Sequence, residues 1–134
     1  EISLGLVGSE MCIRDRWGED LAVNVLQNFG YSLVERNWRP QPVPGIETVR
    51  GEIDAVMIDP DMNLVFVEVK TRSSLSHGHP LEAINEQKKK KLKFLAYSWC
   101  SSHEELDFGS IRLDAVAITG DDEDFHFEHL KWVG

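Results

Sequence analysis

The sequence predicts one α/β domain, in which helices flank a central mixed β-sheet. Two segments have apolar residues at helical spacing, and several others have the alternation or β-branched content of strands. Their order is helix, three strands, helix and one strand, with a short last strand after it, which is typical of a layered α/β domain. The chain has 134 residues, 42% of them hydrophobic, and these values fit one globular domain with an ordinary core.

The first helix and the first strand are predicted from spacing and from their boundaries. Apolar residues recur at helical spacing from Leu21 to Phe29, and Gly30 directly after them is a typical helix stop. Residues 31–38 alternate well enough for a strand. Residues 40–45 contain three prolines and one glycine, so we expect a loop there.

A β-hairpin is predicted next. Its strands are residues 51–58 and 64–70, and the segment from Pro60 to Asn63 between them has the composition of a turn. Apolar residues on both faces of the two strands indicate a position inside the sheet, covered from both sides.

The length of the turn decides which charged residues face each other across this hairpin. Three central residues would set Asp54 opposite Glu68 and Glu52 opposite Lys70, with Cβ atoms about 4.5–5.5 Å apart. Two central residues would shift the register by one and move Asp54 to the other face. We favour the first register because it brings the charges together.

The second half of the chain is predicted to form a loop, a long helix and one or two strands. The loop covers residues 73–80, the helix residues 81–99, and the strands residues 111–119 and 125–130. The apolar stripe of the helix consists of Leu81, Ile84, Leu92, Leu95 and Trp99.

Several basic residues are candidates for phosphate contacts. Lys88 falls on the apolar stripe of the long helix, where it either reaches a phosphate or extends along apolar surface to water. Lys89, with Lys90 and Lys93, lies off the stripe and is expected on a solvated face that can touch a nucleic-acid backbone. Arg72, directly after the second hairpin strand, is a further candidate.

Charged residues inside an apolar hairpin call for a physical explanation. Buried charges are costly unless they are paired or bind a metal, and two adjacent carboxylates repel each other unless a cation lies between them. Mg²⁺ is normally bound by one or two carboxylates together with water and phosphate oxygens. Asp54, Glu68 and Lys70 therefore suggest a site for phosphodiester hydrolysis. The alternative is a structural ion pair at a strand end, with Lys70 partly solvated.

The net charge of −9 argues against a role with nucleic acid, because phosphate backbones select basic surfaces. The distribution of charge softens this argument. Residues 121–124 form an acidic loop, whereas residues 88–91 are four consecutive lysines. We therefore expect any binding of nucleic acid to be weak or strongly dependent on salt.

The N-terminal segment and the cysteines bear on processing and location. Residues 1–16 have no clean period and resemble a translated sequencing adaptor, so we expect a non-native segment followed by a single domain over residues 17–134. No segment approaches the length of a membrane span. Cys12 and Cys100 form no metal or redox motif, which favours a reduced, cytoplasmic protein.

Several motifs of the chain resemble the YraN-like family of bacterial proteins, which are considered related to endonucleases. The similarity extends from about Trp17 to Leu130, and the strings GEID and FVEVKTR in this order are its most specific part. The motifs are Trp17-Gly18-Glu19, Gly30-Tyr31, Arg36-Asn37-Trp38-Arg39, Gly51-Glu52-Ile53-Asp54, Phe66 to Arg72, and Arg112-Leu113-Asp114. The loop between Arg39 and Gly51 is longer than we expect for the family.

The resemblance implies a restriction-endonuclease-like core, as in archaeal Holliday-junction resolvases, and a catalytic set of Asp54, Glu68, Lys70 and Glu19. In this interpretation Asp54 and Glu68 bind Mg²⁺, or Mn²⁺ in its place, with the carbonyl of Val69 as third ligand. Lys70 orients or deprotonates the attacking water and offsets transition-state charge. Glu19 has an alternative role in the first turn of its helix, where a carboxylate suits the helix dipole. Glu52 is a weaker candidate that pairs with Lys70.

The resulting prediction is a Mg²⁺-dependent endonuclease that acts on DNA, including branched or structured DNA. Two alternatives remain open. One is an inactive nucleic-acid-binding or adaptor protein on the same fold, and the other is a protein-interaction module with an acidic surface. Resolvases of this fold cut as homodimers, so the resemblance also implies a dimer, with Trp38 or Trp132 as interface candidates.

Overall fold

The computed structural model describes residues 12–45, 50–76, 78–106 and 109–132. The elements along these residues are α1 (Ile13–Asn28), β1 (Ser32–Trp38), β2 (Ile53–Ile58), β3 (Leu64–Arg72), the short 3₁₀ helix η1 (Pro80–Ala83), α2 (Glu86–Ser101), β4 (Ile111–Gly120) and β5 (Phe125–Trp132). The predicted α/β class and the order of helices and strands are confirmed.

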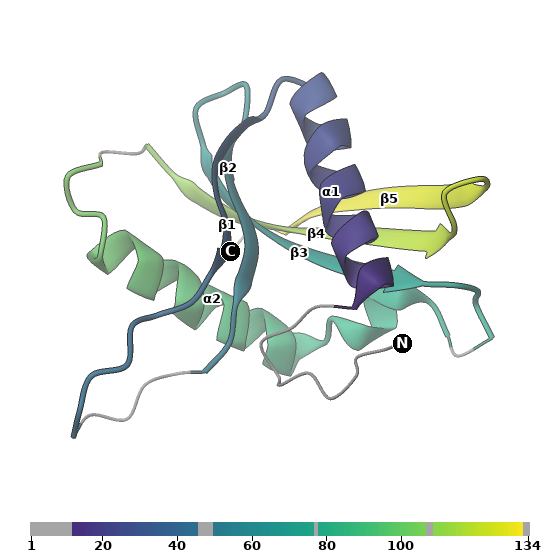
Figure 1. The fold of residues 1–134 in the computed structure, drawn as a ribbon. Coiled ribbons are helices and arrows are strands. Elements are labelled where there is room, and N and C mark those ends of the chain that lie inside the picture. The colour runs from purple at the N-terminus through teal and green to yellow at the C-terminus, as the bar shows by residue number, and fades with distance from the viewer. Residues whose placement is uncertain (1–11, 46–49, 77, 107–108, 133–134) are drawn as a thin grey trace.

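All five strands of the described residues belong to one mixed sheet, in the order β1-β2-β3-β4-β5. Neighbouring strands are antiparallel, except that β3 and β4 run parallel. The sheet is strongly twisted, so β1 and β2 run in a different direction from β4 and β5 (Figure 1). The predicted hairpin strands β2 and β3 lie inside the sheet, as their apolar faces indicated.

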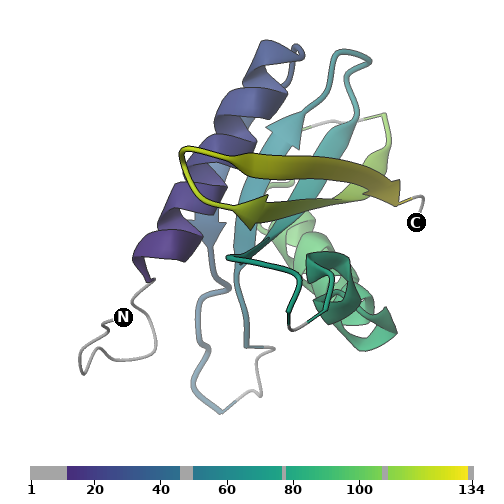
Figure 2. The same ribbon diagram turned by 90° about the vertical axis from the view of Figure 1, so that its right-hand side faces the viewer.

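The two long helices cover opposite faces of the sheet, and each face has its own core (Figures 1 and 2). On the α1 side, Ala22 and Leu26 pack against residues such as Met57, Val67 and Val116. The core on the α2 side consists of Ile53, Val56, Leu64, Phe66, Leu92, Leu95, Ala96, Trp99 and Leu113. This arrangement is compatible with a restriction-endonuclease-like core.

The predicted register of the hairpin is correct. Ala55 pairs with Val67 and Ile58 with Leu64, and continuing the same register by one step puts Asp54 opposite Glu68. The loop has three central residues, because the backbone N–H of Asp59 donates to the carbonyl of Asn63 at 3.0 Å. Two further N–H groups, of Asp61 and Asn63, donate to the carboxylate of Asp59, which closes the turn.

The long helix predicted over residues 81–99 is wrong in its first turn. The chain forms η1 first, breaks at Ile84, and starts α2 at Glu86. Asn85 causes the break, because its side chain accepts a hydrogen bond from the backbone N–H of Lys88 and so caps a new helix. The last strand is also longer than expected, since β5 reaches Trp132 and pairs with β4 from end to end.

The helix α1 begins at Ile13, four residues before the position where the sequence analysis starts the domain. The side chain of Cys12 caps it by accepting from the N–H of Asp15. The remainder of the segment proposed as non-native, residues 1–11, lies outside the described residues, as does the side chain of the interface candidate Trp132. Within the described residues, no helix combines the length and the apolar character needed to cross a membrane.

Candidate active site

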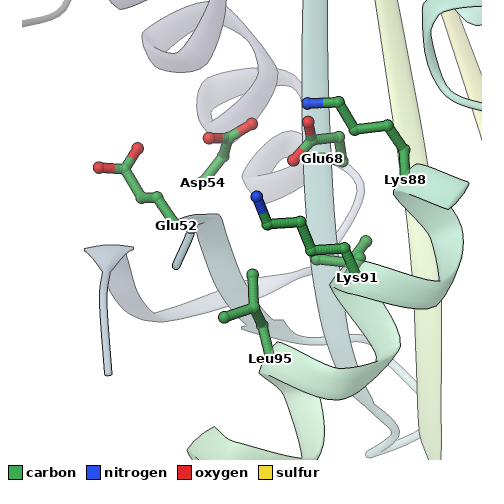
Figure 3. A pocket seen from close by; sticks show the side chains of 8 residues that line it. Glu52, Asp54, Glu68, Lys88, Lys91 and Leu95 are labelled. Atoms are coloured by element: carbon green, nitrogen blue, oxygen red, sulfur yellow. The ribbon is translucent and has the colours of Figure 1, made fainter. Parts of the chain in front are cut away.

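The predicted carboxylates gather at one end of the sheet, where β2 begins and β3 approaches its end. An open pocket of about 200 Å³ lies there between the sheet and α2. Its walls are formed by Gly51, Glu52, Asp54, Glu68, Lys88, Lys91, Leu92 and Leu95. Figure 3 shows carboxylates on the sheet side and two ammonium groups reaching toward them from α2.

Asp54 is the central residue of this site. It is only 9% exposed, and its Oδ2 accepts a hydrogen bond of 2.8 Å from the backbone N–H of Val69 on the neighbouring strand. The carboxylate therefore takes a place in the hydrogen-bond ladder between β2 and β3. This contact fixes its orientation without supplying a positive charge.

Further carboxylates surround Asp54. Glu19 is buried in the second turn of α1, and Glu52 immediately precedes β2. One oxygen from each of Glu19, Glu52 and Asp54 lies within 4.8 Å of the others. Glu68 lies opposite Asp54 in the register of β3, and its charge acts on the pKa of Asp54. Glu19 was predicted from the family motif, and its burial shows that it faces the protein interior.

Burial and mutual repulsion make these carboxylates hard to ionise. Burial, followed by the charges of Glu68 and Glu19, raises the pKa of Asp54 well above its usual 3.8. Burial also raises the pKa of Glu19, although a hydrogen bond from Asn37 opposes this effect. The pKa of Glu68 is raised by burial as well, and the nearby charges of Lys88 and Lys70 partly offset the increase.

This donor set fits a hard divalent cation. All the converging groups are carboxylate oxygens, which are the ligands that Mg²⁺ and Mn²⁺ prefer. A cation beside Asp54 would offset the charges of Glu68 and Glu19, which add to burial in raising its pKa. The pocket beside them leaves space for water and a phosphate group.

Glu52 has different partners from those the sequence suggested. Its Oε2 forms an ion pair of 3.1 Å with Nε of Arg39, and its Oε1 accepts a hydrogen bond from the Asn37 amide. Asn37 of β1 and Arg39, the residue directly after β1, thus already compensate the negative charge of the Glu52 carboxylate. Glu52 is the member of the cluster least in need of a cation.

The predicted basic residues differ in their relation to the pocket. Lys88 lines it, as its place on the helical stripe suggested, whereas Lys89 is not among the lining residues. Lys70 is half-buried on β3 and is not among the residues that line the pocket. Its positive charge opposes the rise in the pKa of Glu68. Arg72 donates from its guanidinium to the carbonyl of Thr71 at 3.0 Å.

Lys91 is a site residue that the sequence analysis missed. It lines the pocket beside Lys88, and its side chain passes over Gly51. A signal for it exists in the sequence, because Lys91 follows Lys88 by three residues and precedes Leu95 by four. The same spacing that pointed to Lys88 therefore applies to Lys91.

Fold and site define an α/β protein with a cluster of buried carboxylates at one end of a mixed sheet. The chain belongs to the uncharacterised protein family UPF0102, whose model matches residues 18–118, and the YraN-like resemblance is thereby confirmed. A UPF0102 protein of Arthrobacter sp. (strain FB24) is 43% identical over 120 residues, which are 89% of this chain and 93% of that relative.

Two other relatives give the same result. A UPF0102 protein of Pseudarthrobacter chlorophenolicus is 44% identical over 119 residues, covering 88% of this chain and 83% of the relative. One of Clavibacter michiganensis subsp. michiganensis is 44% identical over 103 residues, covering 77% and 79%. The similarity thus extends over most of each chain.

Proposed function

We propose that this protein is a divalent-metal-dependent nuclease that hydrolyses phosphodiester bonds of DNA, including branched or structured DNA. The observation that supports this most is the state of Asp54. It is a buried carboxylate with a strongly raised pKa, the charges of Glu68 and Glu19 act on it, and it borders an open pocket. A perturbed acid in such surroundings is a typical functional site.

Each residue has a distinct part in the proposed mechanism. Asp54 and Glu68, together with the Val69 carbonyl, would hold Mg²⁺ or Mn²⁺, and Glu19 would complete the acidic side. When bound, such an ion would supply Lewis-acid activation of the phosphate and of a water molecule. Lys70 orients or deprotonates that water and offsets the charge of the transition state.

The lysines of α2 give the site its preference for a phosphate. Lys88 and Lys91 face the carboxylates from the opposite wall of the pocket, so a phosphate beside the cation would meet two ammonium groups. Lys89 and Arg72 extend the basic surface outside the pocket in this proposal. The net charge of −9 keeps the affinity for DNA low and dependent on salt.

The test begins with binding of the metal alone. Calorimetric titration of Mg²⁺ into the protein is expected to give a dissociation constant in the millimolar range or tighter. Asp54→Asn and Glu68→Gln should abolish this binding, whereas Glu123→Gln in the exposed acidic loop should leave it unchanged. A screen of branched, flapped and single-stranded DNA with Mg²⁺ or Mn²⁺ then tests for cleavage.

The outcomes separate the competing hypotheses. Metal binding and cleavage that both disappear in Asp54→Asn would support the nuclease. Retained DNA binding without metal-dependent cleavage would instead indicate an inactive nucleic-acid-binding protein. No binding of Mg²⁺, even with a non-cleavable DNA present, would leave Asp54, Glu68 and Lys70 as a structural ion cluster. Sedimentation of the protein with and without DNA tests the expected homodimer.

A further inference from the structure

Asn37 has an unusual backbone conformation beside the candidate site. It lies in β1, an edge strand, yet its φ is +52°. Non-glycine residues rarely adopt positive φ, and asparagine tolerates it better than most. Its neighbours Arg36 and Trp38 pair with Ala55 and Ile53, so continuity of the register sets Asn37 opposite Asp54.

The side chain of Asn37 connects two carboxylates of the cluster. Its Nδ2 donates to Oε1 of Glu19 at 2.8 Å and to Oε1 of Glu52 at 3.1 Å. These acids come from different elements, since Glu19 belongs to α1 and Glu52 precedes β2. A single amide group therefore ties the helix to the strand at the point where the acids meet.

We propose that Asn37 is a positioning residue for the metal site, with its amide aligning Glu19 beside Asp54 and turning Glu52 toward Arg39. This inference rests on the proposed function, because the alignment matters only if the acids bind a cation. Outer partners of metal ligands commonly fix ligand orientation in this way.

The neutral amide of Asn37 suits this positioning role better than a cationic side chain would. An amide nitrogen has two N–H donors and no charge, so it satisfies two carboxylate oxygens without competing electrostatically with a metal. The charged partner of Glu19 is farther away than the amide. Arg36 forms its close contact, 2.8 Å, with Asp20 and lies 3.8 Å from Glu19. Arg39 contacts Glu52 on the other oxygen.

Asn37 has two separable properties, its backbone conformation and its amide. Asn37→Gly retains access to positive φ and removes the amide, whereas Asn37→Ala removes the amide and also disfavours the backbone conformation. Comparing the two separates a structural turn from a positioning role. Asn37→Asp keeps the shape but adds a third negative charge in place of the donors.

The deciding experiment is calorimetric titration of Mg²⁺ into wild type and the Gly, Ala and Asp variants, with thermal unfolding of each measured in EDTA. We expect Asn37→Gly to unfold close to the wild-type temperature and to bind Mg²⁺ about 10- to 100-fold more weakly. Asn37→Ala should show the same loss of Mg²⁺ affinity and should also unfold at a lower temperature than wild type. Asn37→Asp should not reach the Mg²⁺ affinity of wild type.

The possible failures are distinguishable. Wild-type affinity in Asn37→Gly would overturn the positioning role and leave the metal site intact, because only the backbone turn would then matter. Absence of Mg²⁺ binding in the wild type would overturn both this inference and the proposed function. If Asn37→Gly unfolds at a much lower temperature than wild type, a Mg²⁺ titration below that temperature still decides between a positioning role and a role of the backbone turn alone.

Discussion

Asp54 and Asp114 are both buried in the same sheet, and their surroundings are opposite. Asp54 is 9% exposed and Asp114 is fully buried. Burial and the neighbouring acids Glu68 and Glu19 raise the pKa of Asp54 well above its usual value. Burial would also raise the pKa of Asp114, but hydrogen bonds from His129 and Arg112 more than offset it and lower that pKa.

Asp114 belongs to a complete ion network at the start of β4. Arg112 donates from Nε to Oδ1 of Asp114 at 2.7 Å and from Nη1 to Asp59 at 2.7 Å. Its Nη2 also donates to the hydroxyl of Tyr31, and Nε2 of His129 lies 2.6 Å from Asp114. This network joins the β2–β3 turn, β4 and β5, and its acids have cationic partners within the chain.

The difference shows how one sheet contains two kinds of buried acid. At Asp114 the chain itself supplies the positive charge, and the carboxylate stabilises the fold. At Asp54 the chain supplies one backbone N–H and more negative charge, which is stable only with a proton or an added cation. The first arrangement balances its charge within the chain, whereas the second supports the metal site proposed above.

The largest expected effect is the loss of stability on substitution of Asp114. Asp114→Asn preserves shape but leaves the Arg112 charge without its main partner, so we expect unfolding free energy to fall by about 3–5 kcal/mol. Urea denaturation at pH 7 measures this. The matched surface variant Arg39→Met removes an ion pair whose arginine is 51% exposed, and should cost about 0–1 kcal/mol. Equal losses in the two variants would contradict the contrast drawn between buried and exposed pairs.

The close packing of α1 on β3 provides a second test. A β-carbon at Gly18 would overlap Cγ2 of Thr71, so Gly18→Ala should push α1 away from the sheet and displace Glu19. We expect a loss of about 1–3 kcal/mol together with weaker Mg²⁺ binding. Thr71→Ser in the same chain removes the clashing methyl and should restore both. Gly109→Ala is the control, since nothing lies within 4 Å of a β-carbon there.

The smallest expected effect is a gain in stability, on substitution of Asp54. Asp54→Asn keeps the hydrogen bond from Val69 and removes the repelled charge, so the metal-free protein should gain stability on the order of 1 kcal/mol at pH 7. Urea denaturation in EDTA measures this gain. A loss comparable to that of Asp114→Asn would mean that Asp54 is a structural acid like Asp114.

The same variants should respond oppositely to pH. A raised folded pKa means that stability from Asp54 is fully present below 3.8 and is lost as pH rises through the raised value. The advantage of Asp54→Asn over wild type should therefore vanish toward pH 3.8 and grow toward pH 7. A lowered folded pKa makes stability from Asp114 present above 3.8 and lost as pH falls through the lowered value, so its variant should approach wild type only in strong acid.

The local pattern of the sequence was sufficient to predict the hairpin. The strict alternation of strands left two possible registers, of which we favoured the one with a three-residue turn, and four residue pairs of β2 and β3 follow that register. The stripe of α2 likewise marked Lys88 as a candidate, and Lys88 lines the pocket. Both predictions depend only on neighbours close in the chain.

Other features depended on contacts between distant segments or on overlooked caps. The break before α2 came from Asn85, a capping residue that the apolar stripe concealed. The roles of Asn37 and Arg112 required the packing of α1, β1, β4 and β5 around them. Asn37 has no periodic signal, because a hydrogen bond between elements has no fixed spacing in sequence. Arg112 stands two residues before its partner Asp114 on one strand, but its contacts with Asp59 and Tyr31 depend on the fold.

The sequence by itself determined the α/β order and the position of the hairpin, because side-chain alternation and turn composition are local properties. It left two registers for the hairpin, and the one chosen, which sets Asp54 opposite Glu68, is correct. Only the tertiary structure decided which buried acid is compensated. That depends on which groups reach the carboxylate in the folded chain, as His129 of β5 reaches Asp114 beside Arg112 of its own strand. At Asp54 the fold instead sets the negative charges of Glu68 and Glu19 to act on the carboxylate, and the charge balance of the site is set by that packing.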